Sequence, residues 1–403
     1  MKITRIDCHV LSDPDPDLSA TSSAQDDIVV EIHTDEGLIG IGETDVNPWI
    51  AEACITAPGT HSMGQSLTDM LIGEDPLQVE QLWERLYVGS AMNGRRGAVV
   101  HAIGALDIAL HDLRGKYHGV PTYQLLGDAV KTSIVPYASL QPETEDFDSY
   151  RVALVEWAVR AKQRGFTAAK PSLTLSGAYA HRGMHEPWSR ATEVLGDLRA
   201  ALGDDFTLMV DVQYAFPDAD TCLEVLRDWR QFDLYFVETP LPADDVKGLH
   251  RVATEQDIPI ATGEWWSTRF EFAPLIENGS IQVAQPDIGR VGGLTEALRV
   301  ADMAERHGMR AIPHLWNTGI SVAAAVHFAA VTPNCPFIEF LPHDLSESPL
   351  RKELLSTEFD MADGVLPLPT RPGLGIELNR DALDRFSEAA TALYQRNRNG
   401  ARS

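Results

Sequence analysis

The chain has 403 residues, a formal net charge of −26 and 44% hydrophobic residues. This length exceeds one ordinary core, so two domains, or a barrel with an added domain, are expected. The negative charge argues against nucleic acid and anionic membranes as partners, because both bind cationic surfaces. No apolar run approaches the roughly 20 residues that span a bilayer. The four cysteines lack metal-site spacing, and we expect a cytoplasmic protein with reduced thiols.

Residues 1–128 are expected to form one α+β unit. Residues 1–11 and 26–44 alternate apolar and polar side chains around a DEG turn, which predicts a small antiparallel meander. Helical periodicity follows in residues 75–87 and 98–119. Two polar, turn-rich segments of this unit, residues 14–27 and 44–64, are long for simple connections. We interpret them as lids over an active site.

Residues 129–360 repeat a strand and helix pattern that predicts a (β/α)-barrel. Parallel strands joined by helices close into a barrel whose active site lies at the carboxyl ends of the strands. The tail, residues 361–403, has Pro and Gly residues that break this rhythm, and we expect it to pack on the N-terminal unit. The eight predicted strands are residues 132–138, 166–172, 206–211, 234–239, 258–264, 281–287, 309–314 and 337–340.

Three acidic residues, Asp211, Glu238 and Glu264, each stand where a predicted strand ends, at spacings of 27 and 26 residues. Any one of them alone fits a helix N-cap or a solvated turn. In series, at the ends of consecutive parallel strands, the three carboxylates are expected to converge. Convergent carboxylate oxygens suit a hard divalent cation, so the sequence predicts one Mg²⁺ per subunit.

Several motifs carry a resemblance to a known family. The segment AIGALDIALHDLRGKYHGVPTYQLLG at 102–127, the three acidic strand ends, DIGRVGG at 287–293 and PHLWNTG at 313–319 keep their order along the chain. Together they resemble the mandelate racemase subgroup of the enolase superfamily. The resemblance implies a modified TIM barrel with an α+β capping domain, and abstraction of the proton α to a carboxylate that is chelated to Mg²⁺.

The chemistry of that reaction sets what the site must supply. A proton α to a carboxylate is very weakly acidic, because its removal creates a dianionic enediolate, so concentrated positive charge must face the carboxylate oxygens. Lys170 is one of only seven lysines in the chain and lies on a predicted strand among apolar neighbours. We therefore predict that it adds a second cation, against the alternative of a surface lysine.

The general base is sought on the seventh predicted strand. His314 ends that strand, and Asp287 ends the neighbouring sixth strand. A carboxylate there accepts the imidazole Nδ1–H, fixes the tautomer and raises the basicity of the ring. Considered alone, His314 would be interpreted as a structural histidine, and Asp287 as a helix N-cap. The adjacency of their strands favours a catalytic dyad.

Two further polar residues are candidates for contact with the substrate. Glu339 ends the eighth strand, and in similar enzymes an acidic residue here hydrogen-bonds the substrate carboxylate. We expect burial beside other carboxylates to raise the pKa of Glu339 and keep it protonated. On the sequence alone, a carboxylate at the start of a helix is an equally good interpretation of Glu339. Gln213 lies two residues after Asp211 on the same face of its strand, where relatives commonly carry Asn.

The second strand departs from the family pattern. Many relatives carry Lys-x-Lys there, whereas this chain has Lys170, Pro171 and Ser172. Serine does not deprotonate a carbon acid without an activating base, so racemisation, which needs proton transfer on both faces, is disfavoured. We predict a carbon–oxygen lyase that dehydrates an acid sugar to a 2-keto-3-deoxy acid, similar to rhamnonate dehydratase.

Alternatives to this function stay open at the level of sequence. A sugar-lactone cycloisomerase or an epimerase uses the same base, and a non-catalytic relative would keep the fold and bind an acid sugar. We expect the partner of this chain to be a small-molecule acid-sugar substrate. We also expect the chain to form a homo-oligomer, as barrels of this type commonly do. Candidate substrate contacts are Trp49, Trp266, Trp316 and Asn317, with His61, Trp265 and Arg269 as weaker ones, and each aromatic residue fits a packing role equally well.

Overall fold

The protein is described by a computed structural model over residues 1–18, 20, 22, 24–144, 146–181, 184–346 and 348–400. Its N-terminal part contains a three-stranded antiparallel sheet of β1 (Ile3–Ser12), β2 (Asp26–Thr34) and β3 (Ile39–Thr44), in the order β1-β2-β3. The central strand β2 is nearly fully buried, because α4 packs across the sheet. The predicted meander is confirmed.

Five helices accompany this sheet, and the first four form a separate apolar core with it, whereas α5 packs against the core of the second part. They are α1 (Pro48–Thr56), α2 (Leu67–Leu71), α3 (Val79–Gly89), α4 (Ala98–His118) and α5 (Tyr123–Leu126). Helix α4 ends at Gly119, which has φ +69° and serves as a left-handed cap. The segment 44–64 is more regular than predicted, because Asn47 caps α1 through its side chain and Pro48 fits the first turn.

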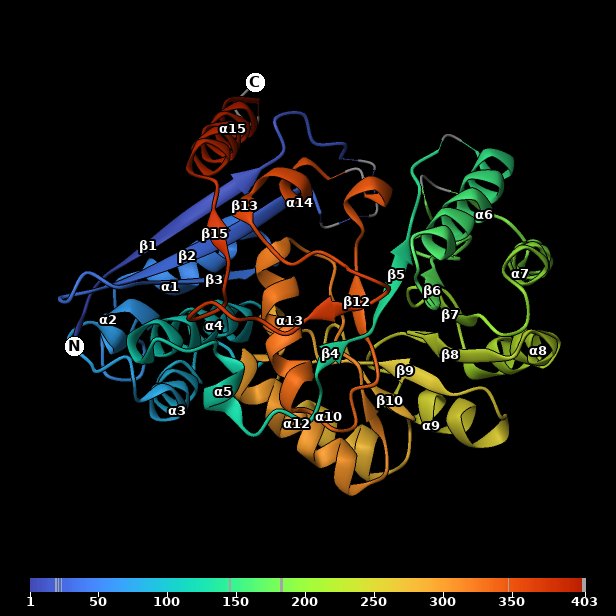
Figure 1. Ribbon diagram of the computed structural model, residues 1–403, viewed down its shortest axis with the longest axis horizontal. Coiled ribbons are helices and arrows are strands. Elements are labelled where there is room, and N and C mark those ends of the chain that lie inside the picture. The colour runs from blue at the N-terminus through green and yellow to red at the C-terminus, as the bar shows by residue number, and fades with distance from the viewer. Residues whose placement is uncertain are drawn as a thin grey trace.

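Eight parallel strands form the second part, in the order β11-β10-β9-β8-β7-β6-β5-β12. Figure 1 shows this curled sheet beside the N-terminal sheet, with helices on its outer side. The strands are β5 (Pro136–Leu140), β6 (Ala168–Pro171), β7 (Thr207–Asp211), β8 (Leu234–Glu238), β9 (Ile260–Thr262), β10 (Val283–Ala284), β11 (Arg310–Ala311) and β12 (Ile338–Phe340). Seven of them lie within the predicted strands, and β5 overlaps the predicted strand 132–138 but continues to Leu140.

The predicted closure of the barrel differs from the structure at one seam. Within the described ranges, β11 and β12 are the two ends of the strand ladder and are not paired with each other. Strand β11 is only two residues long, and Pro313 has no N–H to extend it. The seam is crossed where the Ala311 N–H donates to the Asn334 carbonyl at 3.0 Å. The fold is thus a curled eight-stranded TIM-barrel-like sheet with an α+β cap.

Helices connect the parallel strands along the outside of the sheet. They are α6 (Phe147–Gln163), α7 (Trp188–Leu202), α8 (Ala219–Trp229), the 3₁₀ turn η2 (Arg230–Phe232), α9 (Val246–Glu255), α10 (Thr268–Glu277), α11 (Ile288–Val291), α12 (Leu294–Arg306) and α13 (Gly319–Val331). Within the parts of the chain that are described, no helix combines the length and the apolar character needed to cross a membrane.

The C-terminal segment returns to the N-terminal sheet. Helix α15 (Arg380–Gly400) packs on β1, and Figure 1 shows it beside that strand. The Arg380 guanidinium donates to both carboxylate oxygens of Glu31 on β2, at 2.7 and 2.9 Å. The smaller elements are β4 (Ser133–Ile134), η3 (His343–Leu345), α14 (Pro349–Glu353), β13 (Leu355–Thr357), β14 (Leu366–Pro367) and β15 (Glu377–Leu378), with β4 pairing β14 and β13 pairing β15.

The two parts meet where α4 crosses α11. A Cβ added to Gly104 of α4 would lie 2.4 Å from the Gly289 carbonyl oxygen and 3.2 Å from the Gly293 nitrogen. These are backbone atoms, so neither can turn aside as a flexible side chain would. Nearby, the Trp83 indole N–H of α3 donates to the Gly292 carbonyl at 2.6 Å. Close backbone contact therefore fixes the cap against α11, which directly follows Asp287.

We predict that Gly104→Ala lowers the free energy of unfolding by about 1–3 kcal/mol, because the methyl group overpacks this junction. The matched control is Gly196→Ala in α7, where an added Cβ meets only a ring carbon of Phe232 at 4.0 Å. Alanine there should raise stability by about 0.5–1 kcal/mol. Urea denaturation measures both changes, and equal effects of the two substitutions would contradict the close junction.

Candidate active site

Most of the site is built by alternation along the parallel strands. An apolar layer fills the interior of the sheet, one residue from each contributing strand or its end: Tyr137, Ala168, Met209, Phe236, Ala261, Val283 and Ile312. Because side chains two residues apart share a face, the next inward layer toward the carboxyl ends is polar. It consists of Ser139, Lys170, Asp211, Glu238, Gln285 and His314, and all six are buried.

Glu264 enters this layer by a different route. It lies three residues after the inward-facing Ala261, so simple alternation would direct it outward. The intervening Gly263 has φ +141°, and a Cβ there would approach the Phe272 ring to 2.6 Å. Only glycine fits this position without strain. The shift at Gly263 accounts for the inward placement of the Glu264 carboxylate.

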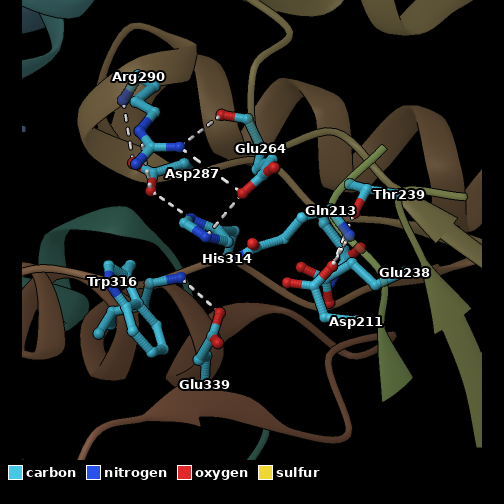
Figure 2. A network of polar contacts seen from close by, with 12 residues as sticks. Asp211, Gln213, Glu238, Thr239, Glu264, Asp287, Arg290, His314, Trp316 and Glu339 are labelled. Carbon is cyan, nitrogen blue, oxygen red and sulfur yellow. Dashed lines mark hydrogen bonds and ion pairs between the residues drawn. The ribbon is translucent and has the colours of Figure 1, made fainter. Parts of the chain in front are cut away.

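A cavity of about 180 Å³ lies above this layer. Seven of the residues predicted from the sequence line it: Lys170, Asp211, Gln213, Glu264, Trp265, His314 and Trp316. Glu238 and Glu339 are fully buried and contact Lys170 from below. Figure 2 shows the carboxylates of β7, β8 and β9 directed toward the same region as His314. The structure therefore brings together six of the seven residues predicted to hold the metal or perform catalysis. The seventh, Asp287, adjoins this group because it is hydrogen-bonded to His314.

Lys170 lies between two buried carboxylates. Its Nζ is 2.8 Å from both oxygens of Glu238 and 2.9 Å from Oε1 of Glu339. Burial alone would lower the pKa of Lys170, but Glu238 and Glu339 raise it well above its usual value. Lys170 is therefore a charged ammonium group that is held by two partners, and not a free amine.

Glu339 differs in protonation from the prediction. Burial favours a raised pKa, as expected, but Lys170 and His314 outweigh it and lower the pKa of Glu339. Its Oε1 also accepts from the Ser139 hydroxyl at 2.6 Å, and its Oε2 accepts from the Leu315 N–H at 2.8 Å. Glu339 is thus an ionised acceptor in this structure, and the prediction of a protonated donor is wrong.

The predicted dyad forms with direct hydrogen-bonding geometry. His314 Nδ1 lies 2.8 Å from Asp287 Oδ2, and the other ring nitrogen, Nε2, lies 2.9 Å from Glu264 Oε2. Burial would lower the pKa of His314, but Glu264, Glu339 and Asp287 raise it well above its usual value. The imidazole is paired on both sides, as Figure 2 shows, and the raised pKa favours its protonated form.

The acidic cluster fits a divalent cation. Among the described residues, Glu238, Glu264 and His314 offer ligand atoms within 4.8 Å of one another. Asp211 is not in this group of three, although it lines the same cavity as Glu264 and His314. Asp211 instead accepts from the Thr239 hydroxyl at 2.8 Å and the Gln213 N–H at 2.9 Å. Burial raises the pKa of Asp211 to about 6 and that of Glu238 to about 8. Raised pKa values of this kind indicate that the two buried carboxylates have too few positively charged partners. A bound divalent cation would supply the missing positive charge.

Three of the predicted substrate contacts lie elsewhere. Trp49 is on α1 and stacks on Tyr394 of α15, with ring centroids 6.1 Å apart. Residues 48–56 of the predicted lid form this helix, which packs against α4. Trp266 is buried in the apolar core, since the turn after Gly263 directs it inward. Its neighbour Trp265 lines the cavity instead.

Asn317 faces the cap and not the cavity, because its amide donates to Asp27 Oδ1 at 3.2 Å. Of the weaker candidates, Arg269 pairs with Glu296 at 2.7 Å and His61 is exposed, so neither lines the cavity. Residues 14–27 do reach the mouth of the sheet: the Trp316 indole donates to Ser22 at 2.9 Å. Residues 19, 21 and 23 of that segment lie outside the described residues.

Two cavity residues were missed by the sequence reasoning. Arg290 is buried and lines the cavity from α11, and Tyr179 lines it from the connection after β6. Arg290 belongs to DIGRVGG, so its motif was recognised but its charge was not given a role. Its partner Asp45 stands 245 residues away, a pairing that no local pattern indicates.

We predict that Lys170→Met lowers the free energy of unfolding by about 3–5 kcal/mol in EDTA, because it leaves Glu238 and Glu339 buried without their cation. Lys247→Met is the control, since Lys247 is exposed on α9, and it should change stability by less than about 0.5 kcal/mol. Denaturant titration measures both. A Lys170 variant as stable as the parent would show that the lysine does not bridge the two acids.

Comparison with known proteins agrees with this architecture. Residues 5–127 match the mandelate racemase/muconate lactonizing enzyme N-terminal domain, and residues 153–382 match the enolase C-terminal domain-like family. D-galactarolactone cycloisomerase of Agrobacterium fabrum is 32% identical over 396 residues, which cover 96% of this chain and 99% of that protein. L-rhamnonate dehydratase of Saccharopolyspora erythraea is 31% identical over 358 residues, covering 87% and 83%.

A solved structure extends the comparison to the metal. The crystal structure of a racemase from Streptomyces coelicolor with bound magnesium superimposes with a TM-score of 0.80 at 26% identity, covering 95% of this chain and 99% of that chain. The matches span both parts of the fold, and the carboxylate cluster lies at the strand ends that the fold uses for its active sites. The chain belongs to the enolase superfamily, in its mandelate racemase subgroup.

Proposed function

We propose that the chain is a Mg²⁺-dependent dehydratase of an acid sugar, which removes the proton α to the carboxylate and eliminates the β-hydroxyl to give a 2-keto-3-deoxy acid. The observation that carries the proposal is the His314–Asp287 dyad, at 2.8 Å, facing a cavity in which Lys170 is fully engaged by two carboxylates. The lining of one cavity thus includes a base, His314, and a fixed cation, Lys170.

The metal site would be formed by Asp211, Glu238 and Glu264. A divalent cation held there supplies positive charge to the substrate carboxylate, which lowers the cost of removing the α-proton. Lys170 adds a second positive charge below the same region. Glu264 and His314 are paired in this structure, so a Glu264 carboxylate that holds a cation no longer raises the pKa of His314 as strongly. The imidazole is then available as a base.

The dyad supplies both proton transfers of the elimination. His314 Nε2 accepts the α-proton, and the electron pair of the C–H bond moves toward the carboxylate. The same proton then passes from His314 to the β-hydroxyl, the C–O bond breaks, and water leaves. The resulting enol becomes the 2-keto acid by losing its hydroxyl proton at the α-carbon and taking a proton at the β-carbon. Asp287 keeps the imidazole oriented and stabilises its protonated form.

The second strand supports elimination over racemisation. Ser172 Oγ lies 3.1 Å from His181 Nε2 and 3.2 Å from Thr174 Oγ1, so its hydroxyl is held within the wall of the barrel. Burial lowers the pKa of His181 to about 4, which makes its imidazole a poor base. Neither Lys170 nor Ser172 is placed as a second base, and this weighs against the epimerase alternative.

A sugar-lactone cycloisomerase is the second candidate. It is favoured by the similarity to D-galactarolactone cycloisomerase, which covers nearly the full length of both chains. Opening a lactone by β-elimination begins with the same α-proton abstraction, but the leaving group is the ring oxygen and no water is lost. A non-catalytic acid-sugar-binding relative is disfavoured because the dyad, the acidic cluster, Lys170 and Glu339 are all in place.

We predict that His314→Asn abolishes exchange of the α-proton while leaving Mg²⁺ binding intact, since Asn keeps the shape of the site without a base. Asp287→Asn should lower kcat by about 10- to 100-fold, because it disturbs the orientation and basicity of an imidazole that is still present. Proton exchange in deuterated water, followed by NMR, measures both. If the His314 variant exchanged at the parent rate, the base would lie elsewhere, with Lys170 the first group to test.

The function itself is tested with a panel of acid sugars and sugar lactones, in deuterated water with Mg²⁺ or with EDTA. We expect a 2-keto-3-deoxy acid from an aldonate, activity lost in EDTA and restored by Mg²⁺, and recovered substrate with its original configuration at C2. Turnover of lactones alone would establish the cycloisomerase. Accumulation of a C2 epimer carrying deuterium would overturn elimination and require a second base.

A further inference from the structure

One buried charge in the cavity wall has no role in the reaction just described. Arg290 lies on α11 directly after the dyad residue Asp287, and only 7% of it is exposed. Its guanidinium forms a two-point ion pair with Asp45: Nε is 2.7 Å from Oδ1, and Nη2 contacts Oδ2. Asp45 follows β3, so this partner comes from the cap and not from the barrel.

Arg290 also stands between two carboxylates that the proposed reaction uses. Its Nη1 lies 3.8 Å from Glu264 Oε2, and its Nε lies 3.8 Å from Asp287 Oδ2. Its backbone N–H donates to Asp287 Oδ1 at 3.1 Å. Figure 2 shows the guanidinium above these two side chains and His314. Its Nη1 also donates to the Glu264 backbone carbonyl at 3.4 Å. A small movement of the guanidinium would therefore shorten either of these long ion pairs to hydrogen-bonding distance.

The distances show which carboxylate holds the guanidinium of Arg290. The contact with Asp45 is bidentate and about 1 Å shorter than those with Glu264 and Asp287, and paired arginine forks of this kind are the stronger interactions. The pair is buried, so its charges are weakly screened. With Asp45 present, the guanidinium stays 3.8 Å from the carboxylates of both Glu264 and Asp287, which is beyond hydrogen-bonding distance.

We propose that Asp45 is a positioning residue of the active site, contributed by the cap, which holds Arg290 away from Glu264 and Asp287 so that these two carboxylates stay available for the metal and the base. This inference rests on the proposed function. It predicts that the cap does more than cover the cavity: the barrel alone would carry an arginine that competes for its own catalytic carboxylates.

The test is Asp45→Asn, measured first by calorimetric titration of the metal-free protein with Mg²⁺. The released guanidinium should pair with Glu264 or Asp287, and the Mg²⁺ affinity should fall by about 10- to 100-fold, as it does when groups that orient metal ligands are removed. With an active substrate, kcat at saturating Mg²⁺ should fall while KM changes little, because Asp45 does not line the cavity.

The double variant Asp45→Asn with Arg290→Gln separates competition from loss of structure. It replaces a buried ion pair by two neutral amides, which is tolerated better than removal of one partner. Since no cation is left to compete for Glu264, the double variant should regain most of the Mg²⁺ affinity that the single variant loses. A merely structural role for Asp45 would leave both variants equally impaired.

Asp27→Asn is the matched control. Asp27 is another fully buried cap carboxylate, and its Oδ1 accepts from the Ile28 N–H and the Asn317 amide. Burial and the neighbouring Glu43 raise the pKa of Asp27 well above its usual value, so a neutral amide should replace it with Mg²⁺ affinity unchanged. Thermal melting of all three variants checks that each is folded.

Parent-like Mg²⁺ affinity and kcat in the Asp45 variant would overturn the inference, as would a double variant weaker than the single one. Failure of the proposed function gives a different result. If the parent protein binds Mg²⁺ but turns over no acid sugar, the titrations still decide the role of Asp45. If the parent protein binds no Mg²⁺, the metal site itself is wrong, and both proposals fall together.

Discussion

The charge balance of one buried polar layer is the constraint on which the rest of this structure depends. Above an apolar layer of seven side chains, the fold places carboxylates from three adjacent strands with Lys170 and His314 among them. Removing charges from water is costly unless each meets an opposite charge or donor. The contacts of Lys170 with Glu238 and Glu339, and of His314 with Glu264 and Asp287, meet part of this requirement. The raised pKa values of Asp211 and Glu238 show that part of it is unmet.

Much of this layer was predictable because it follows from period-two alternation. Asp211, Glu238 and His314 each stand two residues beyond an inward-facing apolar residue at a strand end, and a strand has few ways to place them. The sequence therefore predicts convergence before any contact is known. Glu264 was predicted for the right position by its spacing, although the structural reason is different: Gly263, with φ +141°, shifts the register by one residue.

The remaining features could not be predicted because they depend on pairings between distant segments. The ionisation of Glu339 follows from where the flexible Lys170 side chain ends, and burial alone would give the opposite protonation. Trp265 and Trp266 are adjacent and chemically equal, so only the turn after Gly263 decides which one lines the cavity. Trp49 was assigned to a lid because its segment is rich in turn residues, yet Asn47 and Pro48 begin a helix there.

The cap and the barrel depend on each other because of this charge balance. A site rich in carboxylates must keep its own cations from occupying the positions intended for metal and base. Lys170 is restrained by two acids of the barrel, whereas Arg290, which follows the dyad residue Asp287, is restrained by an acid from the cap. The close backbone contact of Gly104 with Gly289 brings the cap within reach of that arginine. Packing at the junction and electrostatics in the cavity are therefore parts of one arrangement. A shift of α11 would move Asp287 and so disturb the base His314, before it exposed any core residue.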